Sequence, residues 1–342
     1  MASAVIPFDP DDVASIRRAL ADHLTNRFAT TSVIEGPDRY GSGLDTYVYA
    51  IRLDGQLTWE WRQPLVLRVY PTPEQKQKAQ READAQTFAS DRGISAPRPL
   101  LVEPDWQPYG LPFMIMERAP GHQLIDWFKS PLRVRSAIGA MVTLQVQLHS
   151  VPTDDCPLPY ESPLVDRWLA PAKENVEHFR LPGLLEPLHW LEENADLVRD
   201  EDPVFLHNDF HPLNLLVDGD RLTLLDWPDA ALGDRHCDLA RTLALFWLAA
   251  PLERSLVGRT TLGLLRRYIV PAYEREYSSH LAVDPTRLRY WQALHAFTAW
   301  TQIAVMQQEG EEALGARSGV LSEIPAALVP ALEAYFYGHA EA

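Results

Sequence analysis

The segment 206–226, LHNDFHPLNLLVDGDRLTLLD, constrains the fold of this chain more than any other. Two apolar runs of strand length, 213–217 and 222–225, flank an Asp-Gly-Asp sequence whose residues tolerate a positive φ in a tight turn. The segment therefore predicts a β-hairpin. Pairing outward from the turn places Asn214 and Asp226 at the far ends of the two strands, where we expect them to become neighbours.

Oxygen-bearing side chains gather at this open end of the hairpin. Asp209 precedes Asn214 in a turn stiffened by Pro212, so we expect it to lie near the same pair. Mg²⁺ prefers oxygen ligands and usually keeps waters and substrate phosphates in its remaining positions. Phosphoryl transfer needs such a metal and a carboxylate that accepts the proton of an incoming hydroxyl. Asp209 suits the role of the base, and Asn214 and Asp226 suit that of metal ligands.

The order of motifs around these residues resembles one known group of enzymes. The motifs are HxDxxxxN at His207, Asp209 and Asn214, LLDW ending in Asp226 and Trp227, and GDxxxDLA at 233–240. Together they resemble the aminoglycoside phosphotransferase and choline kinase superfamily, small-molecule relatives of protein kinases. The resemblance implies an α+β, two-lobed protein-kinase-like fold with a small β-rich N-lobe and a larger, mainly helical C-lobe. It also implies that Asp209 is the catalytic base and that Asn214 and Asp226 bind Mg²⁺.

Other polar residues of these motifs are interpreted as structural. We expect His207 and Asp238 to brace the catalytic turn through hydrogen bonds, and His211 to do the same. Taken singly, each motif has an ordinary alternative, because an HxD triplet arises by chance and an Asp-Gly-Asp turn is often only a hairpin. Their combination in this order favours the kinase-like interpretation.

A glycine-rich turn should cover the nucleotide phosphates, because backbone N–H groups approach an anion closely only where side chains are absent. The segment 39–52, RYGSGLDTYVYAIR, supplies such a turn before alternating Tyr47, Tyr49 and Ile51, which show the periodicity of a strand. Its GLD triplet is similar to that of the macrolide phosphotransferases, and by this resemblance Gly43 contacts the nucleotide. An ordinary turn is the alternative.

A strand carrying one cation is predicted next. Residues 65–70, LVLRVY, form an apolar run interrupted by Arg68, and a buried charge is costly without a partner. Thr72 and Pro73 begin a helix predicted to run to about residue 90, with Glu82 on its small-residue face. The resemblance implies that Arg68 binds the nucleotide phosphates and that Glu82 orients it. Arg replaces the usual Lys of the superfamily, as in the macrolide phosphotransferase branch. A purely structural ion pair is the alternative.

The boundary between the lobes is predicted after a third strand, FMIME at 113–117, where Pro and Gly follow. We therefore expect an N-lobe over 1–118 and a C-lobe over 119–342. By the resemblance this boundary is the hinge that meets the nucleotide base, although a plain linker is the alternative. The expected hinge contacts are the side chain of Met116 and the main-chain groups of Glu117 and Ala119.

The remainder of the chain has the pattern of core helices. Apolar residues at helical spacing predict helices over 136–150, 237–250, 260–277 and 288–308, and the aromatic residues in them are interpreted as packing. A chain of 342 residues is long enough for two lobes, each with its own core.

The composition of the chain limits the classes of binding partner that we expect. With 47 acidic and 31 basic residues the chain carries a formal charge of −16, which disfavours nucleic acid or an acidic membrane surface as a partner. Surplus carboxylates would suit a cationic acceptor, although they more often serve solubility. Two cysteines, no secretory signal and no apolar run of membrane length predict a cytoplasmic protein. The sequence gives no indication of the oligomeric state.

The motifs predict an ATP- or GTP-dependent phosphotransferase that uses Mg²⁺ and acts on a hydroxyl of a small molecule, such as an aminoglycoside or a macrolide. A metabolite kinase of the same fold, for choline, homoserine or a sugar, is one alternative, and a nucleotide-binding pseudokinase is another. A hydrolase is disfavoured because the sequence contains neither GxSxG nor GxxxxGK.

Overall fold

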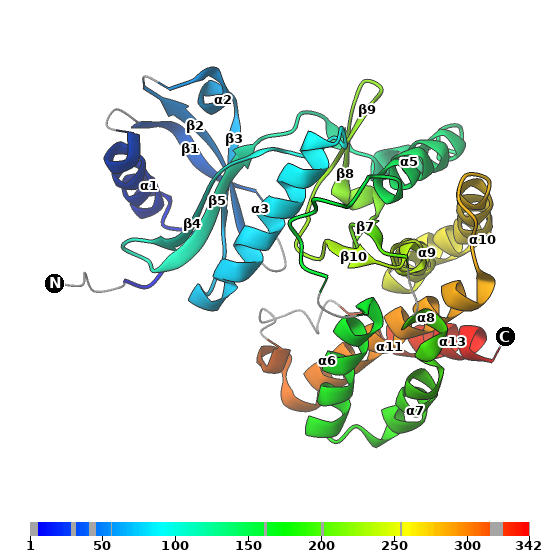
Figure 1. Ribbon diagram of the computed structural model, residues 1–342. Helices are drawn as coiled ribbons and strands as arrows, with labels where there is room; N and C mark the ends of the chain where they lie inside the picture. The colour runs from blue at the N-terminus through cyan, green and yellow to red at the C-terminus, as the bar shows by residue number, and fades with distance from the viewer. Residues whose placement is uncertain are drawn as a thin grey trace. The chain divides into compact units, whose positions relative to one another are not determined.

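The computed structural model describes residues 6–28, 32–40, 46–55, 57–160, 163–199, 202–253, 255–314 and 324–341. The chain folds into two compact units (Figure 1). Unit 1 comprises Met1–His122 and Leu216–Pro228, and unit 2 comprises Gln123–Leu215 and Asp229–Ala342.

Unit 1 is built on an antiparallel sheet with the strand order β1-β2-β3-β5-β4 (Figure 1). Its strands are β1 (Ser32–Tyr40), β2 (Tyr47–Asp54), β3 (Leu65–Val69), β4 (Pro99–Trp106) and β5 (Leu111–Glu117). The strands predicted over 65–70 and 113–117 are therefore confirmed as β3 and β5. All five residues of β3 are buried, because this strand is central and both faces of the sheet are covered.

Both faces of this sheet are covered by helices. Helix α1 (Val13–Phe28), which the sequence did not predict, covers the face that includes Leu67 of β3. Helix α3 (Lys76–Asp91) packs against the face that includes Val66 of β3. Successive strand residues point to opposite faces, so Arg68, two residues after Val66, points toward α3. The shorter elements of this region are α2 (Trp59–Arg62) and the 3₁₀ turn η1 (Pro73–Gln75).

The predicted hairpin is present and belongs mainly to unit 1. It consists of β8 (Leu215–Asp218) and β9 (Arg221–Leu224). The first strand begins later than predicted, because Pro212–Asn214 forms the 3₁₀ turn η3 instead. Asn214 is thus the residue before the strand and not part of it.

By its contacts the hairpin joins unit 1, and the predicted boundary between 118 and 119 stays a prediction. The main-chain N–H of Leu224 donates to the carbonyl of Ser95 at 2.8 Å, and the hydroxyls of Ser95 and Thr223 lie 2.9 Å apart. These long-range bonds tie residues 216–228 to the first part of the chain.

Unit 2 is mainly helical, as the resemblance implied. Its helices are α4 (Ile125–Phe128), α5 (Val134–His149), α6 (Leu164–His178), α7 (Leu185–Asn194), α8 (Asp196–Arg199), α9 (Arg235–Leu252), α10 (Leu256–Ser278), α11 (Pro285–Glu309) and α13 (Leu328–Ala340). The four helices predicted from apolar spacing are confirmed as α5, α9, α10 and α11. The other elements are η2 (Pro182–Leu184), η4 (Glu311–Leu314), and β7 (Val204–Leu206), which pairs antiparallel with β10 (Ala231–Gly233). The short strand β6 (His122–Gln123) lies where unit 1 ends and unit 2 begins in the sequence.

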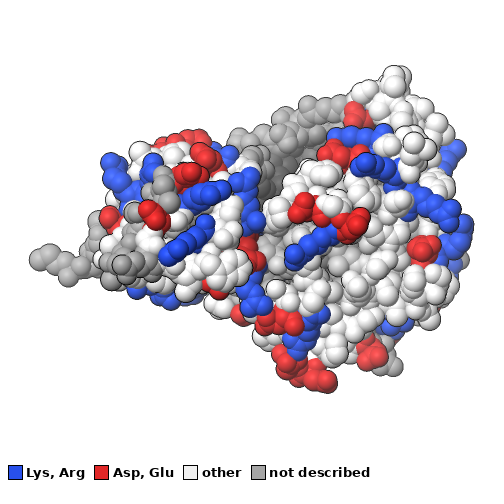
Figure 2. Space-filling view, turned by 90° about the horizontal axis from the view of Figure 1, so that it is seen from above, with Lys and Arg blue, Asp and Glu red and all other residues white. Residues whose placement is uncertain are grey.

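Acidic and basic side chains both occur over the surface that Figure 2 shows, with uncharged areas between them. Among the described helices, none combines the length and the apolar character needed to span a membrane. Cys156 and Cys237 are not joined in a disulfide. The cytoplasmic location expected from the sequence stays a prediction.

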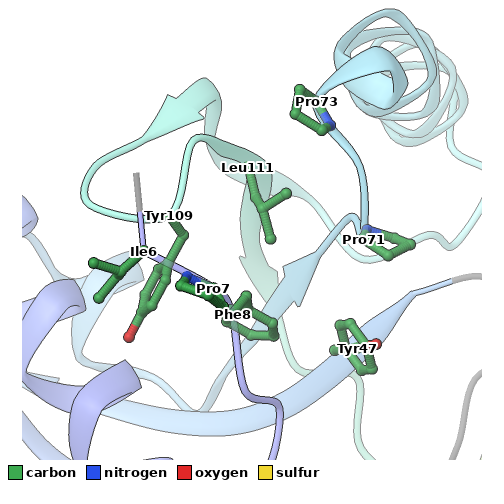
Figure 3. Close-up of a pocket in the computed structure, with 8 residues that line it drawn as sticks. All are labelled: Ile6, Pro7, Phe8, Tyr47, Pro71, Pro73, Tyr109 and Leu111. Atoms are coloured by element: carbon green, nitrogen blue, oxygen red, sulfur yellow. The ribbon is translucent and has the colours of Figure 1, made fainter. Parts of the chain in front are cut away.

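Unit 1 also contains an apolar cavity of about 410 Å³ on the α1 side of its sheet. Its lining residues are Ile6, Pro7, Phe8, Tyr47, Pro71, Pro73, Tyr109 and Leu111 (Figure 3). The ring of Phe8 lies 5.0 Å from that of Tyr109 and 5.4 Å from that of Tyr47, centroid to centroid. No residue assigned to nucleotide binding from the sequence lines this cavity.

Candidate active site

The predicted catalytic residue Asp209 lies in unit 2, in the turn between β7 and η3. The two residues before it, His207 and Asn208, are completely buried. Asn208 adopts φ +62°, a left-handed conformation that Asn tolerates better than most residues. Its amide donates to the carbonyl of Asp229 at 3.0 Å, and this bond holds the turn in place.

Asp238 of α9 braces this turn from below, as the sequence analysis expected. Its buried carboxylate accepts hydrogen bonds from the main-chain N–H groups of Asn208 at 2.9 Å and His207 at 3.3 Å. The Nε2 atom of His149 lies 2.9 Å from the same carboxylate. On the other side of the ring, Nδ1 of His149 lies 2.6 Å from the hydroxyl of Tyr277. Burial by itself would raise the pKa of Asp238, but these donors hold it below its usual range.

The first Asp of the GDxxxDLA motif, Asp234, has an anchoring position at the N-terminus of α9. Its carboxylate accepts from the main-chain N–H of His236 at 3.0 Å and from the indole of Trp291 at 2.8 Å. Arg287 adds an ion pair at 2.9 Å. Burial opposes the charge, but the neighbouring His236 and Trp291 lower the pKa of Asp234 to about 2. The motif therefore joins α9 to α11.

The two carboxylate oxygens of Asp209 have different surroundings. Oδ2 accepts from the side-chain amide of Asn214 at 2.9 Å and lies 3.2 Å from Nε2 of His211. The same amide nitrogen of Asn214 also donates to the main-chain carbonyl of Asp209 at 3.0 Å. Among the residues that the structure describes, Oδ1 has only Nη2 of Arg241 nearby, at 3.7 Å, which is too long for a hydrogen bond. Oδ1 is therefore the oxygen that remains able to accept a proton.

Electrostatics keep this carboxylate ionised. Burial would raise the pKa of Asp209, but the hydrogen bond and charge of His211 and the charge of Arg241 outweigh it, so the pKa lies well below its ordinary value. His295 is buried close to Arg241. Burial and the positive charge of Arg241 together lower the pKa of His295 to about 3. His295 is thus neutral near pH 7, with its Nε2 3.0 Å from the carbonyl of Cys237.

In unit 1 the predicted partners Arg68 and Glu82 form an ion pair. Nη1 of Arg68 lies 2.9 Å from Oε1 of Glu82, and Nη2 donates to Oδ1 of Asp226 at 2.7 Å. The hydroxyl of Tyr70 donates to Oε2 of Glu82 at 2.7 Å. Burial opposes the guanidinium charge, but the carboxylates of Glu82 and Asp226 raise the pKa of Arg68 above its ordinary value. Tyr70 also belongs to this cluster, and no pattern in the sequence predicted it.

We expect Arg68→Ala to lower the free energy of unfolding by about 3–5 kcal/mol, because it leaves the fully buried carboxylate of Glu82 without its cation. Urea unfolding measures this change. Arg98→Ala is the matched control, since Arg98 pairs with Asp91 at the surface of the same unit, and we expect it to cost no more than about 1 kcal/mol. Equal effects of the two variants would show that the Arg68 pair contributes no more than a surface pair.

The other residues assigned to the nucleotide have mixed surroundings. Met116 is buried on the α3 face, where its sulfur lies 3.6 Å from the amide nitrogen of Gln86. Glu117 accepts a hydrogen bond from the main-chain N–H of Arg98 at 3.1 Å. The main-chain N–H of Ala119 donates to no other described residue. Gly43 lies outside the described residues. Contacts of these residues with a nucleotide stay predictions.

The chemistry of Asn214 and Asp226 fits a hard cation. Because the amide nitrogen of Asn214 is held by Asp209, its amide oxygen remains without a hydrogen bond to any described residue. Asp226 adopts φ +65° and uses Oδ1 for Arg68, which leaves Oδ2 for another partner. The described part of the chain holds no cluster of three or more His, Cys, Asp or Glu side chains around a possible metal. Mg²⁺ does not require one, because waters and phosphates complete its shell.

Comparison with known proteins places these motifs in a family. The sequence profile of the phosphotransferase enzyme family matches residues 38–291. No curated protein matches the sequence significantly.

Solved structures show the same fold. One is a putative aminoglycoside phosphotransferase from Ralstonia eutropha JMP134, with a TM-score of 0.65, 18% identity, and coverage of 95% of this chain and 98% of that one. A thermostable mutant of aminoglycoside phosphotransferase APH(4)-Ia, in ternary complex with ADP and hygromycin B, has a TM-score of 0.60 and 16% identity, with coverage of 93% of this chain and 98% of that one. An aminoglycoside-3'-phosphotransferase of type VIII has a TM-score of 0.55 and 21% identity, with coverage of 82% of this chain and 98% of that one.

Proposed function

Because the chain belongs to the phosphotransferase enzyme family, we propose that it transfers the γ-phosphate of ATP or GTP to a hydroxyl group of a small molecule. The observation that carries this proposal is the asymmetry of Asp209. Two donors occupy its Oδ2, whereas its Oδ1 accepts no hydrogen bond from the described residues. An ionised carboxylate held in this way can accept a proton from a bound hydroxyl.

The proposed reaction begins with an acceptor hydroxyl that donates to Oδ1 of Asp209. The acceptor oxygen forms a bond to the γ-phosphorus while the bond between that phosphorus and the β–γ bridging oxygen breaks. The nucleoside diphosphate leaves with the electron pair, and the hydroxyl proton passes to Asp209 and then to solvent. Asn214 and His211 hold the carboxylate in one orientation. Ordering of the base therefore adds little to the activation free energy.

We propose that Asn214 and Asp226 hold Mg²⁺. When bound, the ion would neutralise charge on the phosphate oxygens of the donor. Arg68 keeps the side chain of Asp226 in place by a hydrogen bond of 2.7 Å, and Glu82 in turn fixes Arg68. Arg68 also has the geometry of a planar fork, which suits phosphate oxygens.

Nucleotide binding in this proposal involves the remaining residues of the sequence analysis. Gly43 contacts the phosphates, Met116 lines the base pocket, and Glu117 and Ala119 offer main-chain groups to the base. Solved relatives in complex with ADP or AMP-PNP support a nucleotide as donor. The GLD triplet and Arg68 favour a branch similar to the macrolide phosphotransferases, so antibiotics and metabolites with a free hydroxyl are both candidate acceptors.

A coupled assay of ADP and GDP release across aminoglycosides, macrolides, choline, homoserine and sugars tests this proposal. We expect one compound or class to raise the release rate in a magnesium-dependent manner, with one of the two nucleotides preferred. Release that stays at the acceptor-free background with every compound and both nucleotides would contradict a phosphotransferase of this kind.

A further inference from the structure

The position of Arg241 restricts the acceptors that can reach the catalytic carboxylate. Arg241 belongs to α9, one turn after Cys237, and its Nη2 lies 3.7 Å from Oδ1 of Asp209. Resting on the proposed function, we propose that Arg241 binds the acceptor. We further propose that the acceptor carries a carboxylate or another oxygen-rich group beside the hydroxyl that is phosphorylated, and not an ammonium group.

The hydrogen bonds of Asp209 decide which of its two oxygens can meet the acceptor hydroxyl. Asn214 and His211 both occupy Oδ2, so an incoming hydroxyl meets Oδ1. A hydrogen bond between a hydroxyl and a carboxylate spans about 2.5–2.7 Å. With Nη2 of Arg241 only 3.7 Å from the same oxygen, a hydroxyl on Oδ1 also lies within reach of the guanidinium group. Groups on the neighbouring carbon of the acceptor therefore meet Arg241.

Arg241 has more N–H donors than the described residues use. A guanidinium group has five N–H donors, yet within the described residues Arg241 makes only its contact with Asp209, and its buried Nε has no partner. His295, the nearby titratable side chain of α11, is neutral and therefore adds no charge beside Arg241. A carboxylate or a pair of hydroxyl oxygens would satisfy these donors, because the planar fork matches their geometry.

An ammonium group at the same place would have the opposite effect. It would be attracted by the carboxylate of Asp209 but repelled by the guanidinium of Arg241, which has no second carboxylate partner among the described residues. The side chain of Asp229, whose carbonyl accepts from Asn208 in this turn, already has Nη2 of Arg167 at 4.0 Å. Among the described residues, the charged group in contact with Oδ1 is thus the guanidinium of Arg241.

This local arrangement differs from what the overall charge suggests. The formal charge of −16 would attract cations to the protein as a whole. Exposed charges are screened beyond about 8 Å at physiological ionic strength, whereas Arg241 acts on the acceptor at contact distance. The contact therefore decides which acceptor group is preferred, and the net charge affects only the approach.

Two matched sets of hydroxyl compounds test this inference. The first set is glycerate, glycerol and 3-amino-1,2-propanediol, and the second is gluconate, sorbitol and glucamine. Within each set the carbon skeleton is kept while the end group is a carboxylate, a hydroxyl or an ammonium. Nucleoside diphosphate release is measured for each compound with the wild-type protein, alongside the best acceptor of the wider screen and its own charge variants.

With the wild-type protein, we expect kcat/KM to be at least about tenfold higher for the carboxylate than for the ammonium member, which corresponds to a difference of about 1.4 kcal/mol. In Arg241→Gln the KM for the carboxylate should rise about tenfold or more and the preference should vanish, while the KM for the nucleotide changes less than about twofold. Arg241→Lys keeps the charge without the fork, so it should retain part of the preference.

Arg235→Gln is the matched control. Arg235 lies on the same helix and donates to the carbonyl of Ala282 at 2.9 Å, so this variant should keep the wild-type order of the compounds. Transfer to ammonium compounds at equal or higher rates, unaffected by Arg241→Gln, would overturn the role of Arg241 but leave the proposed function intact. Absence of transfer to any compound would overturn both.

Discussion

We expect Asp209→Asn to lower kcat by about a hundredfold to ten-thousandfold while nucleotide affinity stays close to that of the wild-type protein. Asn has nearly the same shape as Asp, and its amide oxygen can still accept from Asn214, which lies 2.9 Å from Oδ2 in the native turn. The variant therefore keeps the turn but loses the group that accepts the proton. Steady-state kinetics with the best acceptor and calorimetric titration with nucleotide measure the two effects separately.

A second Asp supplies the control for this substitution. Asp220 is exposed in the turn of the β8–β9 hairpin, so Asp220→Asn changes the net charge equally without touching the catalytic turn. Its kcat should stay within about twofold of the wild-type value, as expected for a surface substitution away from the site. If Asp209→Asn turned over at a rate similar to that of Asp220→Asn, the carboxylate of Asp209 would not be the base.

We expect Asp226→Asn to remove most of the effect of magnesium on nucleotide affinity, a loss of at least about tenfold. An amide oxygen can still accept from Arg68, whose Nη2 lies 2.7 Å from Oδ1, so the Arg68–Glu82 pair is kept. The change removes the negative charge of the carboxylate. Binding of Mg²⁺ depends on that charge more than the hydrogen bond from Arg68 does. Calorimetric titration of nucleotide with and without magnesium gives the difference directly.

The control for Asp226→Asn is Asp218→Asn, at the exposed end of β8. That variant should respond to magnesium as the wild-type protein does. If Asp226→Asn also kept the full magnesium effect, Asp226 would serve only as the partner of Arg68, and the metal assignment would be wrong.

Local patterns predicted those parts of the fold that depend on local interactions. The hairpin followed from the Asp-Gly-Asp turn between two apolar runs, and the helix that carries Glu82 followed from the start signals at Thr72 and Pro73. The contact between Arg68 and Glu82 was also predictable, because a lone charge in a buried strand requires a partner. The start of β8 was misplaced because the turn that begins at Pro212 continues as η3 through Asn214, whereas the apolar run suggested that the strand begins at Leu213.

Contacts between distant segments could not be predicted in the same way. His149 meets Asp238 across 89 positions of sequence, and neither residue has a neighbour that signals the other. Arg241 follows the DLA triplet directly, but its approach to Asp209 depends on how α9 packs beneath the catalytic turn. Tyr70 closes the set of partners around Glu82 only because β3 and α3 pack together. Such contacts are products of tertiary packing, which a single sequence does not specify by pattern.

The most direct test of a phosphotransferase with Asp209 as its base is phosphorus NMR of the acceptor after incubation with nucleotide and magnesium. We predict a new phosphate monoester signal on the acceptor with the wild-type protein and a far slower appearance of that signal with Asp209→Asn. Inorganic phosphate as the only new product, or equal rates of ester formation by the two proteins, would contradict the account.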